Sequence, residues 1–314
     1  MNQKIFTGAI AAVAFLLPNT AMGQKADFNV IPMPQKVEMA SAASPFVLNA
    51  KTCISIANNS ADMKRNANML AMYIEEQTGI RPVVGKAAKG AAAIVLSIDK
   101  SVKNAEGYKI NVANSNITIS GSTAAGVFYG IQTLRKSLPV VKGTASQVEI
   151  PAVNISDAPR FAYRGTHLDV SRHFVSADSI RQFIDMLALH NINRFHWHLT
   201  DDQGWRIEIK KYPKLTTIGS KRDETVIGHN SGKYDGKPYG GFYTQKEIRE
   251  IVKYAADRYI TIVPEIDLPG HMQAALAAYP EYGCTGGPYK VWTKWGISDN
   301  VLCAGNDNTL KFMD

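Results

Sequence analysis

The 314-residue chain has 35 basic and 27 acidic residues, a formal net charge of +8, and is 45% hydrophobic and 20% charged. This composition supports a buried core and excludes a largely disordered chain. No Lys/Arg block is dense enough to predict a nucleic-acid-binding surface, so we expect no nucleic-acid partner and a positive charge spread over solvated faces.

Residues 1–23 predict a signal peptide. Lys4 supplies the positive start, residues 5–17 form an apolar run, and Ala21-Met22-Gly23 offers small residues for cleavage. The run is too short to span a hydrocarbon core of about 30 Å, so we expect no stable membrane insertion, with an uncleaved anchor as the alternative. The prediction is an exported protein, periplasmic or extracellular, which begins near Gln24.

Residues 24–150 predict a small α+β domain. Ser60 is expected to begin an amphipathic helix that ends at Gly79, and a second apolar helical pattern runs over residues 127–138. Residues 93–98 predict a strand, and residues 108–112 and 117–119 alternate as in a hairpin. Residues 140–159 have the composition of a linker. Nothing in this domain predicts catalysis.

Residues 151–314 predict strands alternating with helices. The expected strands are 163–170, 193–199 and 260–267, and the expected helices begin at Ser176 and at the capping-box sequence Thr244-Gln-Lys-Glu247. This alternation is typical of a parallel sheet. The overall prediction is an α/β protein, in which a small α+β domain precedes about three strands of a (β/α)₈ TIM barrel.

Polar residues gather where the predicted strands end. Arg172 follows the first strand, Asp201 and Asp202 follow the second, and Asp267 and His271 follow the third. In a (β/α)₈ barrel this is the catalytic face. Carboxylates and Arg can bind hydroxyls and the indole of Trp205 can stack on a sugar, so the mixture predicts a sugar site.

Each of these residues also has a structural interpretation. The two aspartates could cap a loop, Arg172 and His271 could lie in solvent, and the indoles of Trp292 and Trp295 are expected in the core. His196 and His198 point the same way from a strand, so a metal-dependent hydrolase is an alternative function. We expect no metal or other cofactor.

Three cysteines are present. Cys53 is expected to be a small buried hydrophobe. Cys284 and Cys303 flank a Gly- and Trp-rich stretch, and export would permit a disulfide between them. Two buried thiols are an equally good prediction.

Three ordered motifs resemble those of family 20 glycoside hydrolases, the β-N-acetylhexosaminidases. They are Ser171-Arg-His-Phe174, Phe195-His-Trp-His-Leu-Thr-Asp-Asp-Gln-Gly-Trp-Arg206 and Pro264-Glu-Ile-Asp-Leu-Pro-Gly-His271. Val30-Ile-Pro-Met-Pro-Gln35 and the first domain resemble the small domain that precedes the barrel in that family.

The resemblance implies a retaining mechanism in which the substrate's own 2-acetamido group is the nucleophile. It implies that Arg172 binds hydroxyls of the terminal N-acetylhexosamine, and that Asp201 and His271 form a relay to the general-acid Glu. Asp202 and Trp205 are expected to contact the substrate.

The sequence departs from the family in one respect. The family's Asp-Glu pair follows a later strand, and no Gly-Asp-Glu occurs in these 314 residues. We therefore expect the chain to be an N-terminal fragment that is inactive alone. A glycan-binding protein without catalysis is a further alternative. The oligomeric state and the choice between GlcNAc and GalNAc are not predicted.

Overall fold

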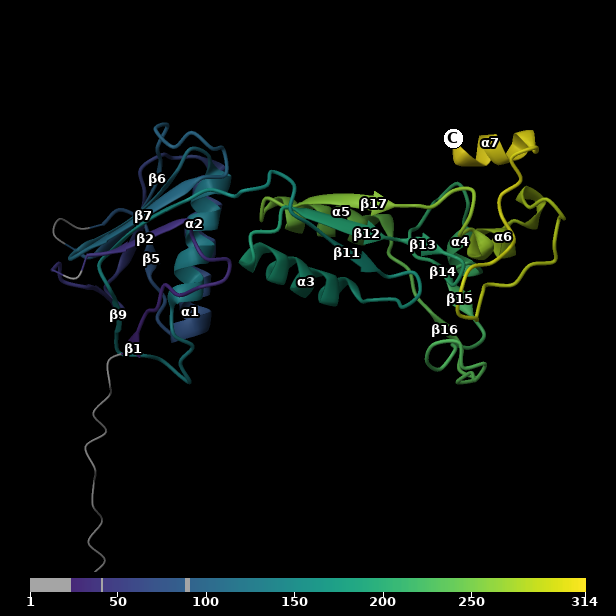
Figure 1. Cartoon of the computed structure of the whole chain (residues 1–314), viewed down its shortest axis with the longest axis horizontal. Helices are drawn as coiled ribbons and strands as arrows, with labels where there is room; N and C mark the ends of the chain where they lie inside the picture. The colour runs from purple at the N-terminus through teal and green to yellow at the C-terminus, as the bar shows by residue number, and fades with distance from the viewer. Residues whose placement is uncertain (1–23, 41, 88–90) are drawn as a thin grey trace, which may run out of the picture.

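The computed structural model describes residues 24–40, 42–87 and 91–314, so the predicted signal peptide lies outside the described residues. Figure 1 shows an elongated arrangement, with a first unit of sheet and helices, three central strands, and a lobe of short elements at the C-terminal end. In the part of the chain that the structure describes, no helix has the length and apolar character required to cross a membrane.

The first unit contains a mixed sheet of seven strands, in the order β2-β10-β7-β8-β6-β4-β5. The strands are β2 (Lys36–Met39), β4 (Cys53–Ile56), β5 (Val83–Val84), β6 (Ala93–Ile98), β7 (Tyr108–Ala113), β8 (Asn116–Gly121) and β10 (Val153–Asp157). A smaller sheet has the order β1-β9-β3. Its strands are β1 (Gln24–Lys25), β3 (Phe46–Leu48) and β9 (Val148–Ile150).

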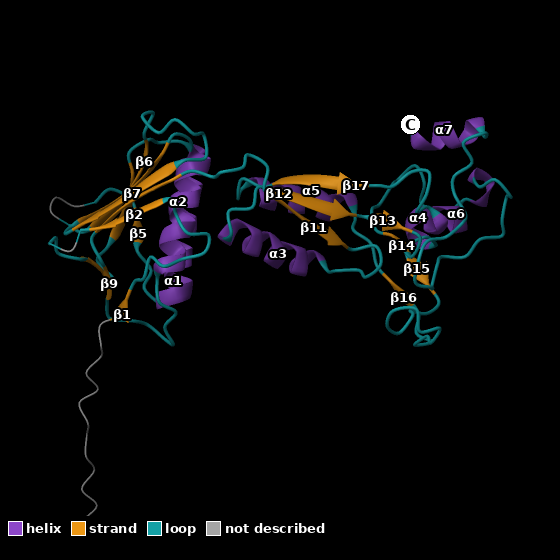
Figure 2. Cartoon of the chain, viewed as in Figure 1, coloured by secondary structure: helices purple, strands orange, loops and turns teal. Residues whose placement is uncertain are grey.

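Two helices, α1 (Ala61–Thr78) and α2 (Ala124–Ser137), pack against each other and against this sheet (Figure 2). The predicted start and end of the first helix are confirmed. The Ser60 hydroxyl accepts a hydrogen bond from the Met63 amide at 3.2 Å, and Gly79 closes the helix at φ +71°, where glycine has no Cβ to clash. The predicted hairpin is also confirmed, and β7 alternates strictly between buried and exposed residues.

The predicted linker is wrong in part, because residues 140–159 contain two strands. Within that stretch β10 pairs antiparallel with both β2 and β7, so it lies inside the seven-stranded sheet. Val153 and Ile155 supply its buried face. Pro151 and Pro159 flank the strand without interrupting its hydrogen bonds. The first unit therefore extends to Asp157, beyond the predicted boundary at residue 150.

The second unit begins with three parallel strands, β11 (Gly165–Asp169), β12 (Arg194–His198) and β17 (Thr261–Glu265), in that order. The crossover helices are α3 (Ala177–Leu189) and α5 (Gln245–Ala256), which pack against each other. The predicted alternation is thus confirmed. Both predicted helix starts are confirmed as well, with Ser176 as an N-cap and a complete capping box between Thr244 and Glu247.

Short elements lie beyond the carboxyl ends of the three strands (Figure 1). They are β13 (Thr200–Asp201), β14 (Gly204–Trp205), β15 (Lys221–Arg222), β16 (Tyr239–Gly240), α4 (Lys214–Thr217), α6 (Gln273–Ala278), η1 (Pro280–Tyr282) and α7 (Asp307–Met313). This is the end of the sheet at which an α/β fold places its ligands.

The two units are joined by specific contacts besides the chain itself. The Arg65 guanidinium of α1 donates to the Asp257 carbonyl at 3.1 Å, and the Tyr259 hydroxyl donates to the Asn66 side chain at 3.1 Å. The rings of Phe128 and Tyr259 lie 5.2 Å apart. The turn that leads into β17 is therefore held by the helices of the first unit.

Candidate functional site

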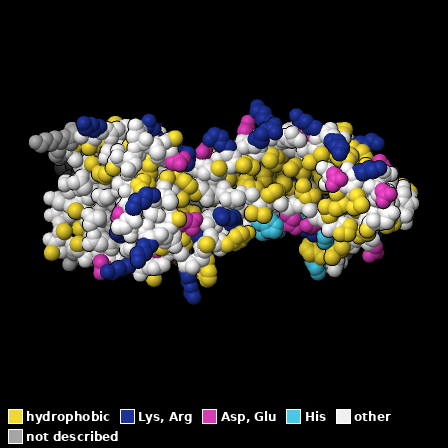
Figure 3. All heavy atoms as spheres, turned by 90° about the horizontal axis from the view of Figure 1, so that it is seen from above, with side chains coloured by type: hydrophobic (Ala, Val, Ile, Leu, Met, Phe, Trp, Pro, Cys, Tyr) yellow, Lys and Arg dark blue, Asp and Glu magenta, His cyan; other side chains and the backbone are white. Residues whose placement is uncertain are grey.

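The register of the three parallel strands places ionisable residues in two rows on one face of the sheet. His167 of β11 is the partner of His196 of β12, and Asp169 is the partner of His198. His198 is in turn the partner of Glu265 on β17. Because side chains alternate along a strand, these five residues share a face. In Figure 3, histidine and acidic side chains lie together below the hydrophobic side chains in the middle of that view.

Asp201 and His271, predicted from separate motifs, contact each other. The Asp201 carboxylate lies 2.9 Å from the His271 Nδ1 and also accepts the Asp202 amide at 2.6 Å. Asp201 is buried, so its carboxylate oxygens require hydrogen-bond donors from the protein. His271 has φ +57°, an uncommon backbone conformation for a residue with a Cβ, at the turn that follows β17. With Nδ1 donating to Asp201, its Nε2 remains available to a further group.

Arg172 connects three side chains at the same edge. Its Nη1 lies 2.8 Å from Asp169, its Nη2 lies 2.8 Å from Asp201, and its Nε donates to Gln203 at 3.1 Å. A guanidinium has five N–H groups, so two stay free for a ligand. The side chain is partly exposed, as a ligand-binding role requires.

His198 is surrounded by carboxylates. Its Nε2 lies 3.3 Å from Asp201 and 3.6 Å from Asp267, and its Nδ1 lies 3.6 Å from Asp169. Burial favours the neutral ring, but the hydrogen bond to Asp201 and the surrounding negative charges raise the pKa of His198. When this imidazole is protonated, its charge offsets part of the negative charge of the surrounding acids.

Asp169, Gln203 and Glu265 belong to this cluster and were missed by the sequence analysis. Asp169 and Glu265 are the last residues of their strands, and that position was the available signal. Although burial opposes it, the hydrogen bonds from Arg172 lower the pKa of Asp169. Burial, together with a hydrogen bond to Glu265, raises the pKa of Asp267.

The predicted role of Asp202 in substrate binding requires correction. Its carboxylate is fully buried and accepts the backbone amides of Gln273 at 3.1 Å and Ser298 at 3.0 Å. Both oxygens are therefore used to fix the start of α6 and the segment around residue 298. The alternative interpretation, in which this aspartate caps loops, describes it correctly.

The predicted stacking role of Trp205 also requires correction. Its side chain is only 4% exposed and packs in an apolar cluster with Leu215, Met272 and Leu276. The indole N–H donates to the Ile207 carbonyl at 2.6 Å. The adjacent polar sequence suggested a site, but the pleat of β14 turns this ring away from the cleft.

The prediction for Trp295 is also wrong, because we expected this indole in the core and it lies at the surface. It is 53% exposed and contacts His229 edge-on, with ring centroids 4.5 Å apart. Both residues line a cavity of about 610 Å³ that also contains Asp169, Arg172 and Gln203. The segments 225–229 and 293–297 thus bring an indole to the edge at which Arg172 lies.

The structure contains no disulfide between Cys284 and Cys303, and of the alternative prediction, two buried thiols, only the free thiols are found. Both are free thiols, yet neither is fully buried. A hydrogen bond with Cys303 raises the pKa of Cys284, so the two sulfurs are neighbours. An antiparallel bridge between Gly283 and Leu302 holds the two segments together.

His196 and His198, predicted as a possible metal pair, face the same side of β12 but approach different oxygens of Glu265, with the His196 Nε2 at Oε2 and the His198 Nε2 3.8 Å from Oε1. His198 lies among Asp169, Asp201 and Asp267 at the end of the strand. His196 lies two residues earlier on the same strand and contacts Glu265. The geometry therefore does not make these two imidazoles joint ligands of one ion.

Comparison with known proteins agrees with the motifs. Residues 161–314 match the family described as "Glycosyl hydrolase family 20, catalytic domain", and residues 27–158 match "Glycosyl hydrolase family 20, domain 2". A beta-hexosaminidase of Porphyromonas gingivalis is 39% identical over 96% of this chain and 39% of its own length.

Two solved structures are similar across both units. The N-acetyl-beta-hexosaminidase of Streptomyces plicatus, in complex with Thio-NAglucal, is 38% identical with a TM-score of 0.79, covering 90% of this chain and 54% of that one. The beta-N-acetylhexosaminidase of Bacteroides fragilis is 35% identical with a TM-score of 0.72, covering 91% and 53%. The chain thus spans about half the length of these proteins.

Proposed function

The chain belongs to family 20 of the glycoside hydrolases, and we propose that the protein is an exo-acting β-N-acetylhexosaminidase. Its substrate would be a glycan with terminal GlcNAc or GalNAc. The observation that supports this most directly is the Asp201–His271 contact at 2.9 Å beside the partly exposed Arg172. Those three groups supply hydroxyl recognition and proton handling at one sheet edge.

The residues present account for two parts of a substrate-assisted reaction. Arg172 would hold ring hydroxyls with its free N–H groups, which fixes the sugar relative to the protein. Asp201 would keep His271 in the tautomer that presents Nε2 to a general acid, and would stabilise the imidazolium when a proton moves. In such a reaction the 2-acetamido oxygen would attack the anomeric carbon while the bond from that carbon to the leaving oxygen breaks and the leaving oxygen takes a proton from the general acid, so no protein carboxylate is needed as nucleophile.

We also propose that the protein is exported, to the periplasm or the extracellular space. This rests on the sequence of residues 1–23 alone, with its short apolar run and small residues at the cleavage point.

The proposed activity is tested with two aryl glycosides and the protein expressed from its complete gene. We expect hydrolysis of an aryl N-acetyl-β-glucosaminide, and at least about 100-fold slower hydrolysis of the matching β-glucoside, which lacks the acetamido nucleophile. Equal rates on both would contradict substrate assistance. Binding of N-acetylglucosamine without any hydrolysis would instead identify a glycan-binding protein.

A matched pair of variants locates the activity at this edge. Arg172→Ala should raise KM and lower kcat, because each charge-assisted hydrogen bond is worth about 1.5–3 kcal/mol. Arg181→Ala, in α3, where the side chain pairs with Asp178 and Glu250, should leave both constants unchanged. Equal effects of the two changes would remove Arg172 from the site.

A further inference from the structure

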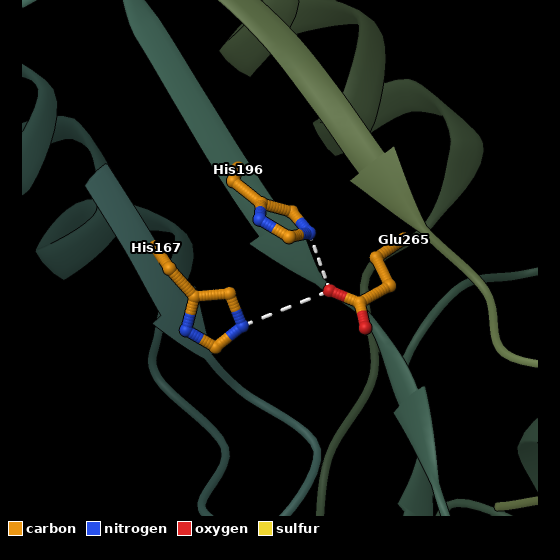
Figure 4. A group of neighbouring side chains, drawn as sticks. All are labelled: His167, His196 and Glu265. Atoms are coloured by element: carbon orange, nitrogen blue, oxygen red, sulfur yellow. Dashed lines mark ion pairs between the residues drawn. The ribbon is translucent and has the colours of Figure 1, made fainter. Parts of the chain in front are cut away.

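His167, His196 and Glu265 form a second cluster, which the proposed reaction does not use. The three side chains come from β11, β12 and β17 and converge from three neighbouring strands (Figure 4). The nearest donor atoms of the three residues all lie within 4.8 Å of one another. The imidazole Nε2 atoms of both histidines point to the same carboxylate oxygen, Glu265 Oε2.

That oxygen lacks a conventional partner. Glu265 Oε2 is sealed from solvent and accepts no hydrogen bond of good geometry, although the His196 Nε2 is in contact with it and the His167 Nε2 lies 3.7 Å away. Among the described residues, no Lys or Arg forms an ion pair with Glu265. A buried carboxylate oxygen is stabilised by hydrogen-bond donors or by a positive charge, and a cation bound between this oxygen and the two imidazole nitrogens would supply that charge.

We propose that His167, His196 and Glu265 bind a divalent transition-metal ion, with zinc as the best match. Two imidazoles and one carboxylate form a donor set that proteins use for zinc, whereas calcium and magnesium prefer oxygen alone. Donors in a tetrahedral zinc site lie about 3.3 Å apart when each bond is about 2.0–2.1 Å. The 3.7 Å separation of His167 Nε2 from Glu265 Oε2 needs only a small side-chain rotation.

The neighbouring groups of acids and histidines are weaker candidates for an ion. Asp201 already has the Arg172 guanidinium at 2.8 Å as its counter-charge. Both carboxylate oxygens of Asp202 accept hydrogen bonds from backbone amides. In the His167–His196–Glu265 cluster, by contrast, one carboxylate oxygen faces two imidazole nitrogens, and no Lys or Arg among the described residues pairs with that carboxylate.

The ion would brace three strands that are far apart in sequence. His167 and His196 are register partners on β11 and β12, and Glu265 reaches across from β17. A metal bound to all three would resist the separation of these strands. Asp201, His271 and Arg172 are not among its ligands, although Glu265 also borders the proposed site, because its Oε1 lies 3.8 Å from the His198 Nε2. The proposal concerns metal binding and does not rest on the glycosidase activity.

The test is metal binding by the full chain, measured without any activity assay. Protein stripped with a chelator is titrated with zinc chloride, and with Co²⁺ as a spectroscopic probe for tetrahedral sites. We expect one equivalent to bind and to raise the thermal unfolding temperature. The X-ray absorption of bound zinc should require two imidazole ligands. A wild-type chain that binds no zinc, or zinc without two imidazoles, overturns the proposal.

Variants place the ion on these residues. Glu265→Gln keeps the shape and removes the charge, and His167→Ala removes one ligand. Each should weaken binding roughly 100-fold or more, because even groups that only support a ligand are worth 10–100-fold. His190→Ala, at an exposed position beyond α3, is the matched control and should bind as wild type. Undiminished binding by folded Glu265→Gln and His167→Ala would overturn the assignment.

Discussion

The two units of the molecule bury different kinds of residue. Among the described residues up to Asp157, the buried polar side chains are Thr, Ser, Asn and Gln, with no Asp, Glu, Lys, Arg or His. The second unit buries His198, Asp201, Asp202, Arg206, Arg222 and Arg258. Buried charge is costly unless it is paired. The first unit therefore gains stability from apolar packing, while the second buries His198 and Asp201 at the proposed site and uses other buried charges, such as Asp202 and Arg206, to hold its backbone segments.

The largest expected effect is that of Asp201→Asn in the second unit. The amide keeps the shape but not the charge that orients His271, so kcat should fall roughly 100-fold or more and the pH profile should shift. Asp178→Asn, in the first turn of α3, is the exposed control and should leave both unchanged. A wild-type pH profile in a folded Asp201→Asn variant would make this aspartate a loop cap only.

Arg206→Met should cost the most stability. The buried guanidinium donates to the carbonyls of Val170, Ser171, Ser220 and Gly241. Losing these bonds should lower the free energy of unfolding by about 3–5 kcal/mol, roughly 1 kcal/mol for each. Chemical denaturation measures this. Arg81→Met, an exposed ion pair in the first unit, should cost less than about 1 kcal/mol.

Ser60→Ala, in the first unit, should have a smaller effect, which is confined to stability. Loss of the N-cap hydrogen bond to Met63 should lower the free energy of unfolding by about 1 kcal/mol. Catalytic constants should stay unchanged, because α1 is remote from Arg172. The exposed Ser146→Ala controls for the loss of a hydroxyl. A change in kcat in Ser60→Ala would show that the units are coupled in function.

The smallest expected effect is a pH dependence from His198. Since its pKa is raised on folding, the stability it contributes is fully present below its unfolded pKa of about 6.5 and is lost as the pH rises through the folded value. Chemical denaturation at a series of pH values above about 6.5 should show that the free energy of unfolding declines as the pH rises. The decline should be smaller in His198→Gln and unchanged in His190→Gln. An identical decline in both variants would assign it to another group.

Local sequence signals predicted the elements well. Ser60, Ser176 and the Thr244–Glu247 box act through hydrogen bonds within four residues, so the sequence contains the whole interaction. The strand β10 was missed because its pairing with β2 lies more than 100 residues away. Pro residues at its ends have the composition of a linker, although they only flank the strand.

The site was predictable as a location, and less so as a set of roles. Asp201, His271 and Arg172 were found because each follows a strand, and parallel strands place those ends together. The role of Trp205 depends on the direction in which a two-residue strand points its side chains, and that of Asp202 on the turn before this strand, and no periodicity reveals either. Glu265 was missed because its importance comes from its register beside His198 and its contact with His196.

The hydrogen bonds between the first unit and the turn before β17 limit how freely either unit can be replaced by the corresponding unit of a relative. Arg65 and Asn66 hold that turn through Asp257 and Tyr259, and β17 ends at Glu265 only a few residues later. A chimera that takes its first unit from a relative would have to carry a matching α1 surface. Without that match, β17 would lose the contacts that hold its N-terminal end, opposite the end at which Glu265 lies.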